Sequence, residues 1–210
     1  MKSYSQYGED SFILSLFPHG YIGAVLEVGA YEPLALSNSR LFIEAGWSAM
    51  LVEPSPAPLR ALLEEYGHNP NVSIFSGAMA NSTGRKTQRF DISDGPLSTS
   101  NPASSKTWGK DDLLIGSLNV PLYGPDFFCL ERVDFLSVDT EGNGIDIADA
   151  MLACWRNGHL SFIPKVICIE REAGRDAYID QMAWVNGYEI VPHDPSGGVN
   201  RILRLRSWKV

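Results

Sequence analysis

Two carboxylates that follow a buried apolar strand are the residues of this chain best suited to chemistry. Asp139 and Glu141 stand one residue apart in the segment VDFLSVDTEGN, at 133–143, where the apolar run stops. Both side chains point into one crevice if the turn begins between them. There they could take a proton from a hydroxyl, bind a divalent metal, or balance a positive charge and cap the following helix. The residues leave these three roles open.

Other polar residues extend two of these roles. In the metal-binding alternative, Glu170 at the end of KVICIE and Asp194 in a late polar loop would add oxygen ligands. His193 and Asp194 could instead form an acid–base pair over the crevice, although a plain polar loop is the simpler interpretation. For Glu170 the alternative is a surface ion pair with a nearby arginine, either Arg171 or Arg175.

The first quarter of the chain predicts a strand–helix–strand unit of the nucleotide-binding kind. Two segments, VLEVGAYEP at 25–33 and SAMLVEPSP at 48–56, each predict a buried strand that ends in an acidic or glycine-containing turn. A helix-sized stretch lies between them. In such folds an acidic residue that ends the second strand, here Glu53, accepts hydrogen bonds from ribose hydroxyls. An adenosine-type ligand is therefore expected.

The turn after the first strand argues against a dinucleotide. Several glycines are needed for the backbone to approach a diphosphate, but Tyr31 and Leu34 stand where the second and third would be. Glu32 adds a negative charge to the same turn. A ligand with a ribose, no phosphate and some positive charge fits better, and S-adenosylmethionine is such a ligand. Glu27 could accept a hydrogen bond from its ammonium group, directly or through water.

The composition predicts a single domain over residues 1–210. Apolar residues make up 44% and charged residues 20%, as in ordinary globular proteins. The net charge of −8 argues against a broad nucleic-acid surface. The apolar runs are too short to span a bilayer, and no export signal is visible. The 3 cysteines lack close pairing, which indicates reduced thiols and a cytoplasmic location.

Hydrophobic periodicity predicts alternating helices and strands. The expected strands are 24–29, 48–53, 72–78, 133–139, 165–170 and an antiparallel final pair, 188–191 and 201–206. The expected helices are 8–17, 36–45, 57–66, 143–158 and 174–186. The third helix is expected to bury Leu59, Leu62, Leu63 and Tyr66, and the last one Tyr178, Met182 and Val185.

Residues 92–126 depart from this pattern. They are rich in Ser, Pro, Gly and Asn and follow an extended piece at 86–91. A stretch of this length without clear periodicity predicts a functional lid or a disordered insertion. It lies between the third and fourth strands, which places it at the carboxyl edge of the sheet, where α/β enzymes bind ligands.

The order of these motifs resembles the FkbM-type methyltransferases, a branch of the S-adenosylmethionine-dependent class I fold. The resemblance covers nearly the full length. It rests on SQYGED at 5–10, VLEVGAYEP at 25–33, SNSRLFIEAGW at 37–47, LVEPSP at 51–56, VDFLSVDTEGN at 133–143 and ICIERE at 167–172. The resemblance implies an α/β fold, a Rossmann-like three-layer sandwich. Its seven-stranded sheet would be mostly parallel, with an antiparallel last strand.

The resemblance also implies residue roles. The implied cofactor-binding residues are Glu27, Gly29, Ala30, Tyr31, Asn38, Glu53, Pro54, Gly77, Ala78, Met79 and Asp139. Within that set, Glu53 would hold the ribose, Gly77 to Met79 would lie on the adenine side, and the first three would line the methionine end. Asp139 and Glu141 would sit beside the sulfonium as the catalytic pair.

Some of these assignments have alternatives. Asn38 could instead cap a helix, which is the favoured interpretation. Gln6 and Asp10 in SQYGED could reach the cofactor turn, or the acidic residues there could cap the first helix. Two departures from the family pattern stand out: Tyr31, Glu32 and Pro33 where many members have a second glycine, and N-G-I-D after the fourth-strand motif.

The sequence thus predicts an S-adenosylmethionine-dependent methyltransferase that methylates a hydroxyl of a small molecule, sugar or glycan. The hydroxyl acceptor is implied by the resemblance, because no residue selects it. An NAD(P)-dependent oxidoreductase, disfavoured by the missing glycines, and a non-catalytic cofactor-binding interaction protein are the alternatives. Neither nucleic acid nor membrane is expected as a partner. The need for a divalent metal and the oligomeric state stay open.

Overall fold

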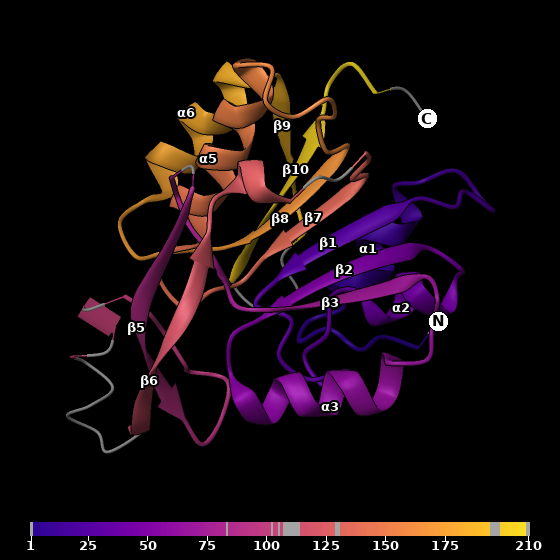
Figure 1. Ribbon diagram of the computed structural model, residues 1–210. Coiled ribbons are helices and arrows are strands. Elements are labelled where there is room, and N and C mark those ends of the chain that lie inside the picture. Colours follow the sequence, from indigo (N-terminus) through magenta and orange to yellow (C-terminus); the bar gives the residue numbers. More distant parts are fainter. Residues whose placement is uncertain are drawn as a thin grey trace.

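A seven-stranded sheet with helices on both faces forms the body of the protein, and a three-stranded sheet stands beside it (Figure 1). The computed structural model describes residues 2–82, 84–101, 103–104, 106, 114–128, 131–193 and 198–208. The expected α/β Rossmann-like sandwich is confirmed. No helix in this described part of the chain has both the length and the apolar character that a bilayer span requires.

The large sheet has the strand order β3-β2-β1-β7-β8-β10-β9. Its strands are β1 (Ala24–Val28), β2 (Ser48–Glu53), β3 (Val72–Ser76), β7 (Phe135–Val138), β8 (Val166–Glu170), β9 (Tyr188–Val191) and β10 (Asn200–Leu205). From β3 to β8 all neighbours pair in parallel, and β10 is antiparallel to β8 and β9. The parallel strands therefore present their carboxyl ends at one common edge.

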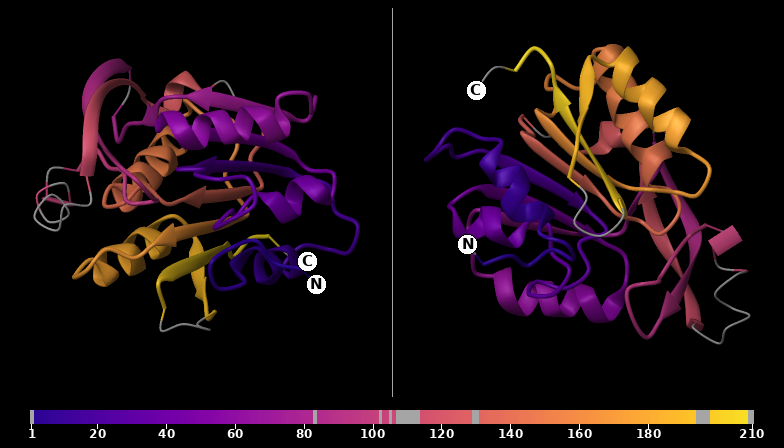
Figure 2. Two further views of the ribbon diagram at one scale, coloured as in Figure 1. Left: turned by 90° about the horizontal axis from the view of Figure 1, so that it is seen from below. Right: turned by 180° about the vertical axis from the view of Figure 1, so that it is seen from behind.

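Five helices cover the two faces of this sheet (Figure 2). They are α1 (Glu9–Ser15), α2 (Arg40–Glu44), α3 (Pro56–Tyr66), α5 (Gly144–Arg156) and α6 (Asp176–Val185). Alternate strand residues face opposite clusters: Leu26 and Val28 pack in the cluster with α5 and α6, whereas Val25 and Leu51 pack in that with α1 to α3. Because both faces are covered, the central strands are nearly continuous apolar runs.

The first crossover helix is shorter than expected. We expected 36–45, but α2 begins at Arg40. Leu36 has a left-handed φ of 58°, which is incompatible with a right-handed helix at that residue. Residues 34–39 form a bent connection instead, and this connection carries Asn38 to the edge of the sheet.

Two expected helix faces need correction. On α3, Leu62 and Tyr66 are buried as expected, but Leu63 is 50% exposed. On α6 the buried residues are Ile179, Met182 and Ala183, whereas Tyr178 and Val185 are largely exposed. The predicted inward face of α6 is right at Met182 but wrong at Val185 and Tyr178. Tyr178 is amphipathic, and the prediction treats it as apolar. Its hydroxyl donates to Asp149 at 2.7 Å near the surface.

The chain leaves the large sheet at Gly77. The strand expected at 72–78 ends at Ser76, and Gly77, with φ of 151°, turns the chain into β4 (Ala78–Met79) of the small sheet. A Cβ at Gly77 would lie 2.9 Å from the carbonyl oxygen of Pro121, so the glycine allows β4 and the neighbouring strand to approach closely.

The small sheet contains a long hairpin that corrects the expectation for residues 92–126. The extended piece at 86–91 belongs to β5 (Arg85–Ser93), which pairs antiparallel with β6 (Leu114–Tyr123). A short 3₁₀ turn, η1 (Pro125–Phe127), follows β6. The segment is therefore regular over its last third. Alternation at Leu118, Val120 and Leu122 was the available signal, and Pro121 obscured it.

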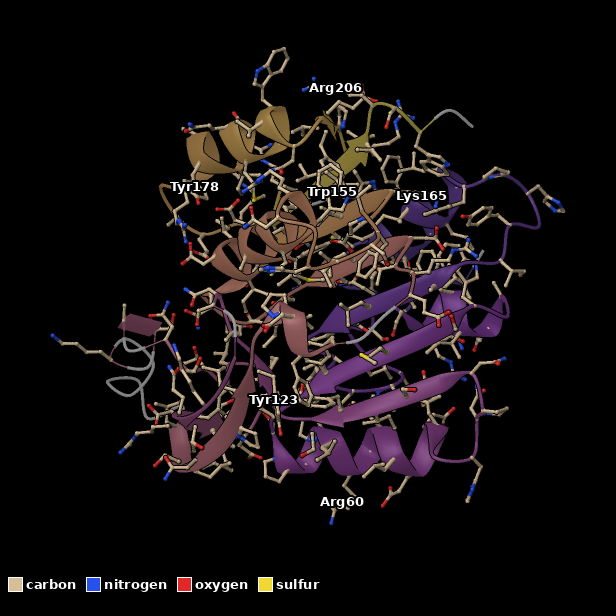
Figure 3. All side chains as sticks on the ribbon, turned by 45° about the horizontal axis from the view of Figure 1, so that its top comes forward. Arg60, Tyr123, Trp155, Lys165, Tyr178 and Arg206 are labelled. Carbon is tan, nitrogen blue, oxygen red and sulfur yellow. The ribbon has the colours of Figure 1, made fainter. Side chains whose placement is uncertain are left out.

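Aromatic packing joins the two sheets. Tyr123, at the end of β6, meets Phe75 of β3 edge to face, with ring centroids 4.8 Å apart, and Phe127 at 4.3 Å. Figure 3 shows Tyr123 between the hairpin and the large sheet, in contrast to Arg60, which projects outward from α3. The hairpin is thereby fixed beside the carboxyl edge of the sheet.

Candidate functional site

A cavity of about 380 Å³ opens at the carboxyl edge of the large sheet, which is the size of an ordinary small-molecule pocket. Most of the predicted site residues meet there. It is lined by Gly29, Tyr31, Asn38, Glu53, Pro54, Ala78, Met79, Asp139 and Glu141 from the predicted set. Glu27, Ala30 and Gly77 are not among the lining residues. The remaining walls come from the hairpin, from the amino-terminal segment and from the start of β10.

Glu53 ends β2 and is held rigidly. It is 4% exposed, and its two carboxylate oxygens accept backbone N–H groups of Ser55 at 2.6 Å and Tyr31 at 2.9 Å. Burial raises the pKa of Glu53, while these hydrogen bonds oppose the rise. A carboxylate offers about four acceptor positions, so roughly two remain for donors from the cavity.

Glu27 lies beneath this edge with an unsatisfied oxygen. It is 3% exposed, and its Oε1 accepts the backbone N–H of Asn38 at 2.8 Å. Its Oε2 is buried without a hydrogen-bond partner among the described residues. Burial raises the pKa of Glu27 to about 7. A buried oxygen of this kind calls for a donor from a ligand or a water.

Asn38 contributes to the cavity and does not cap a helix. The residue that precedes α2 is Ser39, and it makes no side-chain cap hydrogen bond. The Asn38 side chain instead donates a hydrogen bond to Ser137 Oγ, near the end of β7, at 3.0 Å. The favoured interpretation of Asn38 as a cap is therefore wrong.

Gly29 allows the ends of β1 and β7 to come together. Its φ is 82°, and a Cβ at this position would overlap the carbonyl oxygen of Asp139. Tyr31, two residues on, also has a left-handed φ, of 48°. The turn therefore reaches the cavity with one glycine and one strained tyrosine instead of several glycines.

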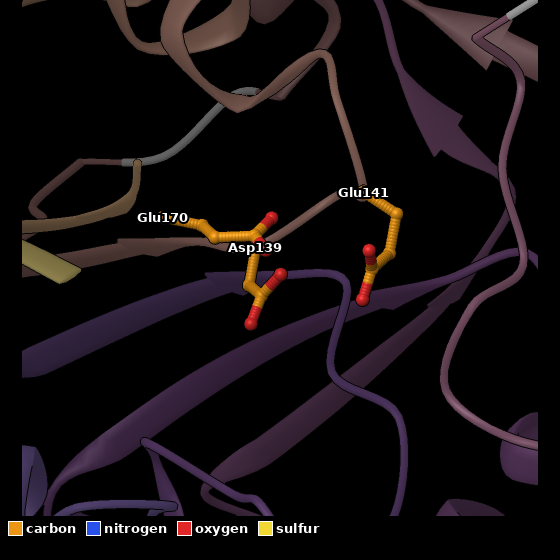
Figure 4. Close-up of side chains that lie close together, drawn as sticks. All are labelled: Asp139, Glu141 and Glu170. Carbon is orange, nitrogen blue, oxygen red and sulfur yellow. The ribbon is translucent and has the colours of Figure 1, made fainter. Parts of the chain in front are cut away.

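Three carboxyl groups gather on one side of the cavity (Figure 4). Asp139 follows β7, Glu141 lies two residues further along the loop, and Glu170 ends β8. One oxygen from each lies within 4.8 Å of the others. The expected ion pair of Glu170 with an arginine does not form, because Arg171 pairs with Asp176 and Arg175 with Asp146 and Glu172.

Burial and mutual repulsion control the protons of this group. Burial, followed by the charges of Asp139 and Glu141, raises the pKa of Glu170 to about 9. Burial, and then the charge of Asp139, raises the pKa of Glu141 to about 7. Burial also raises the pKa of Asp139, but a hydrogen bond from Glu170 opposes this. At neutral pH the Glu170 carboxyl therefore carries a proton.

The amino-terminal segment supplies a wall that the sequence analysis assigned only in part. Gln6 lines the cavity as expected, but Asp10 does not, since its carboxylate accepts the N–H of Tyr4 at 2.7 Å. Glu9 takes its place: it is 2% exposed and accepts from Asn200 of β10 at 2.7 Å. This contact joins residues 191 positions apart, so no local pattern could reveal it.

The polar loop after β9 is described up to His193 and again from Gly198. His193 stacks on Phe12 of α1, with ring centroids 4.3 Å apart. Asp194, the proposed partner of His193 and further metal ligand, lies outside the described residues.

No family model and no curated protein matches this chain, but solved structures do. It is similar to the methyltransferase FkbM from Methylobacillus flagellatus, with a TM-score of 0.58 and 12% identity over 93% of this chain. The match spans only 47% of that protein. It is also similar to a TehB-like SAM-dependent methyltransferase from Corynebacterium glutamicum, with a TM-score of 0.50 and 13% identity over 96% of this chain and 89% of that one. At these identities the likeness concerns the fold, and the chain has the class I fold of SAM-dependent methyltransferases.

Proposed function

We propose that the protein is an S-adenosylmethionine-dependent methyltransferase that methylates a hydroxyl of a small molecule, sugar or glycan. One observation carries the proposal. Glu53 and Asp139, at the carboxyl ends of β2 and β7, line the same cavity in a methyltransferase fold. Such a reaction requires one carboxylate that binds the ribose and a second carboxyl group that can accept the proton of the acceptor hydroxyl.

The residues of the cavity fit the cofactor. The free acceptor positions of Glu53 suit the two ribose hydroxyls, and Pro54, Ala78 and Met79 offer an apolar wall for the adenine. The unsatisfied Oε2 of Glu27 suits the ammonium group, reached through a water because Glu27 lies behind the lining. S-adenosylmethionine, when bound, supplies an already activated methyl group.

The remaining task for the protein is to place a hydroxyl and remove its proton. Burial raises the pKa of Asp139, and the neighbouring Glu170 carboxyl opposes this rise, which favours the ionised form of Asp139. We assign Asp139 as the general base and Glu141 as its neighbour on the acceptor side. Positioning of the hydroxyl accounts for most of the remaining acceleration. Pro96, Leu97 and Ser98 line the same cavity and are proposed as part of a lid over the acceptor.

A divalent metal is the alternative role for the same carboxyl group. Three oxygens from separate side chains could surround Mg²⁺, which prefers oxygen ligands. We prefer the general-base role because it needs only residues that line the cavity. The oxidoreductase alternative is weaker, since Tyr31 and Leu34 stand where a glycine-rich diphosphate turn at the end of β1 would have its second and third glycines.

Calorimetry with S-adenosylhomocysteine tests the proposal. The wild-type protein should bind it, and Glu53→Ala should lose about 2–4 kcal/mol of binding free energy, the value of charge-assisted hydrogen bonds to two hydroxyls. Glu64→Ala, an exposed glutamate of α3, is the matched control and should bind normally. Binding of NAD without binding of S-adenosylhomocysteine would favour the oxidoreductase. A screen of hydroxylated acceptors with labelled methyl donor then identifies the acceptor.

A further inference from the structure

A short segment beside β5, residues 99–101, holds the loop that carries Glu141. Thr99 is completely buried, and its hydroxyl donates to the backbone carbonyl of Glu141 at 2.9 Å. Asn101 donates from its side chain to the carbonyl of Gly142 at 2.5 Å. Two consecutive carbonyls of the loop are therefore bound by side chains from a part of the chain about 40 residues away.

The loop needs outside support because its backbone is unusual. Glu141 has a left-handed φ of 54°, which a residue with a Cβ rarely adopts, and Gly142 follows with φ of 108°. A Cβ at Gly142 would lie 2.6 Å from Ser104 Oγ and 2.9 Å from Asn101 Nδ2. Asn101 and Ser104 thus pack directly against Gly142 and leave no space for a side chain at that position.

The segment is itself anchored to the hairpin. Thr99 exchanges two backbone hydrogen bonds with Asp91 of β5, at 2.8 and 2.9 Å. Gln88 of the same strand donates to the carbonyl of Ser100 at 3.1 Å. In addition, the Thr99 hydroxyl accepts the N–H of Asn101 at 2.9 Å, which sets the two side chains relative to one another.

We propose that Thr99 and Asn101 are positioning residues that hold the Glu141 carboxylate over the cavity by fixing the backbone of Glu141 and Gly142. Neither residue is among those that line the cavity, whereas their neighbours Ser98 and Ser100 are. Thr99 and Asn101 therefore act through Glu141, on the side of the cavity that the proposed function gives to the acceptor. The inference rests on that function only for the role of Glu141.

The test compares four variants with the wild type. Three of them keep or remove the side-chain hydrogen bonds of Thr99 and Asn101, and the fourth is a control. Thr99→Val keeps the shape and removes both hydrogen bonds of the side chain, and Thr99→Ser keeps both. Asn101→Ala removes the contact to Gly142 together with the hydrogen bond that the Asn101 side chain accepts from the N–H of Ala103. Its side chain is partly exposed, so this variant stays informative if Thr99→Val fails to fold. Thr87→Val makes the same chemical change at an exposed position of β5 and serves as the matched control.

Two measurements report the position of the loop without an acceptor. The first is the carboxyl ¹³C resonance of Glu141 at pH 7, assigned by its loss in Glu141→Gln. The second is amide hydrogen exchange in the peptide that spans Asp139 to Ile147. In Thr99→Val and Asn101→Ala the resonance should move towards those of exposed glutamates, and exchange should be about tenfold faster, as expected for one lost hydrogen bond. Thr99→Ser and Thr87→Val should match the wild type.

An unchanged Glu141 resonance and unchanged exchange in folded Thr99→Val would overturn the inference, as would an equal change in Thr99→Ser. Calorimetry with S-adenosylhomocysteine on the same samples separates this result from the proposed function. A wild-type protein that fails to bind the probe contradicts the function, and the comparison of loop positions still decides whether Thr99 and Asn101 hold Glu141.

Discussion

Asp139 and Glu170 each bring a carboxyl oxygen to within 4.8 Å of the other across the ends of two adjacent parallel strands. The register aligns Val138 of β7 with Ile169 of β8, so the residue after each of them reaches the same point of the sheet edge. Two carboxyls this close cannot both ionise readily. Burial and the charges of Asp139 and Glu141 raise the pKa of Glu170 to about 9, so Glu170 carries a proton at neutral pH beside the Asp139 carboxyl.

Asp139→Asn should lower turnover more than cofactor affinity. The substitution keeps the shape and removes the charge that accepts a proton from the acceptor. Loss of general-base help predicts turnover reduced about 100- to 10,000-fold on the true acceptor, with S-adenosylhomocysteine affinity changed only a few-fold. Turnover is measured with and without added magnesium. Near wild-type rates in both conditions would exclude the general-base and the metal roles together.

Stability should fall as the pH rises from about 5 to 9. The folded-state pKa values of Glu27 and Glu141 are raised to about 7 and that of Glu170 to about 9, above the value of 4.5 expected for unfolded chains. The folded state thus binds more protons than the unfolded state in this window, so the free energy of unfolding decreases with pH. Urea unfolding at a series of pH values measures the slope.

Glu170→Gln isolates one contribution to that slope. The amide stays neutral, so the loss of stability between pH 7 and 9 should be smaller than in the wild type. The difference is at most the contribution of one proton, about 1.4 kcal/mol per pH unit. Glu172→Gln, which alters a neighbouring glutamate paired with Arg175, is the control. A slope that Glu170→Gln leaves unaltered would contradict the assignment of the proton to Glu170.

Gly29→Ala should damage both stability and cofactor binding. The position has a left-handed φ, and a Cβ would overlap the Asp139 carbonyl, so the ends of β1 and β7 must separate. Gly20→Ala is a matched control, because Gly20 has a similar φ of 76° with nothing within 4 Å of the added carbon. The control should lose about 1–2 kcal/mol for backbone strain alone. Gly29→Ala should lose about 1–3 kcal/mol more, from overpacking, in thermal or urea unfolding.

Cofactor and acceptor should protect Leu97 and Ser98 from hydrogen exchange. Both residues line the cavity, so a bound molecule restricts them. Exchange is compared between the free protein, the complex with S-adenosylhomocysteine, and that complex with an acceptor. Strong protection in the free protein, with no further change on binding, would refute a lid at this position.

The sequence predicts the large sheet well because its strands are buried on both faces. Near-continuous apolar runs marked β1, β2, β7 and β8, and Gly29 after the first run and an acidic residue at the end of each of the other three marked the edge of the sheet. The cluster of Asp139 and Glu141 followed from that edge alone. The antiparallel placement of β10 was also accessible, because a short loop joins it to β9.

The remaining parts depend on contacts between distant residues. The left-handed conformation of Leu36 shortened α2 against its apolar pattern, and the pairing of β6 with β5 was hidden by Pro121 and by the polar segment between the two strands. The wall formed by Glu9 and Asn200 requires both ends of the chain to meet. Such contacts are determined by tertiary packing, which overrides local preference.

The break at Gly77 divides the cavity between two independently paired sheets. The cavity residues from β1, β2, β7 and β8 belong to the large sheet, whereas Phe90 and the segment from Pro96 to Ser100 are attached to the small sheet. Aromatic contacts around Tyr123 join the two sheets. Changes in the hairpin between Gly77 and Tyr123 can therefore alter which molecules the cavity admits while every backbone hydrogen bond of the large sheet stays in place. If Ala78, Met79, Thr99 and Asn101 are kept, this junction is a natural point for redesigning specificity.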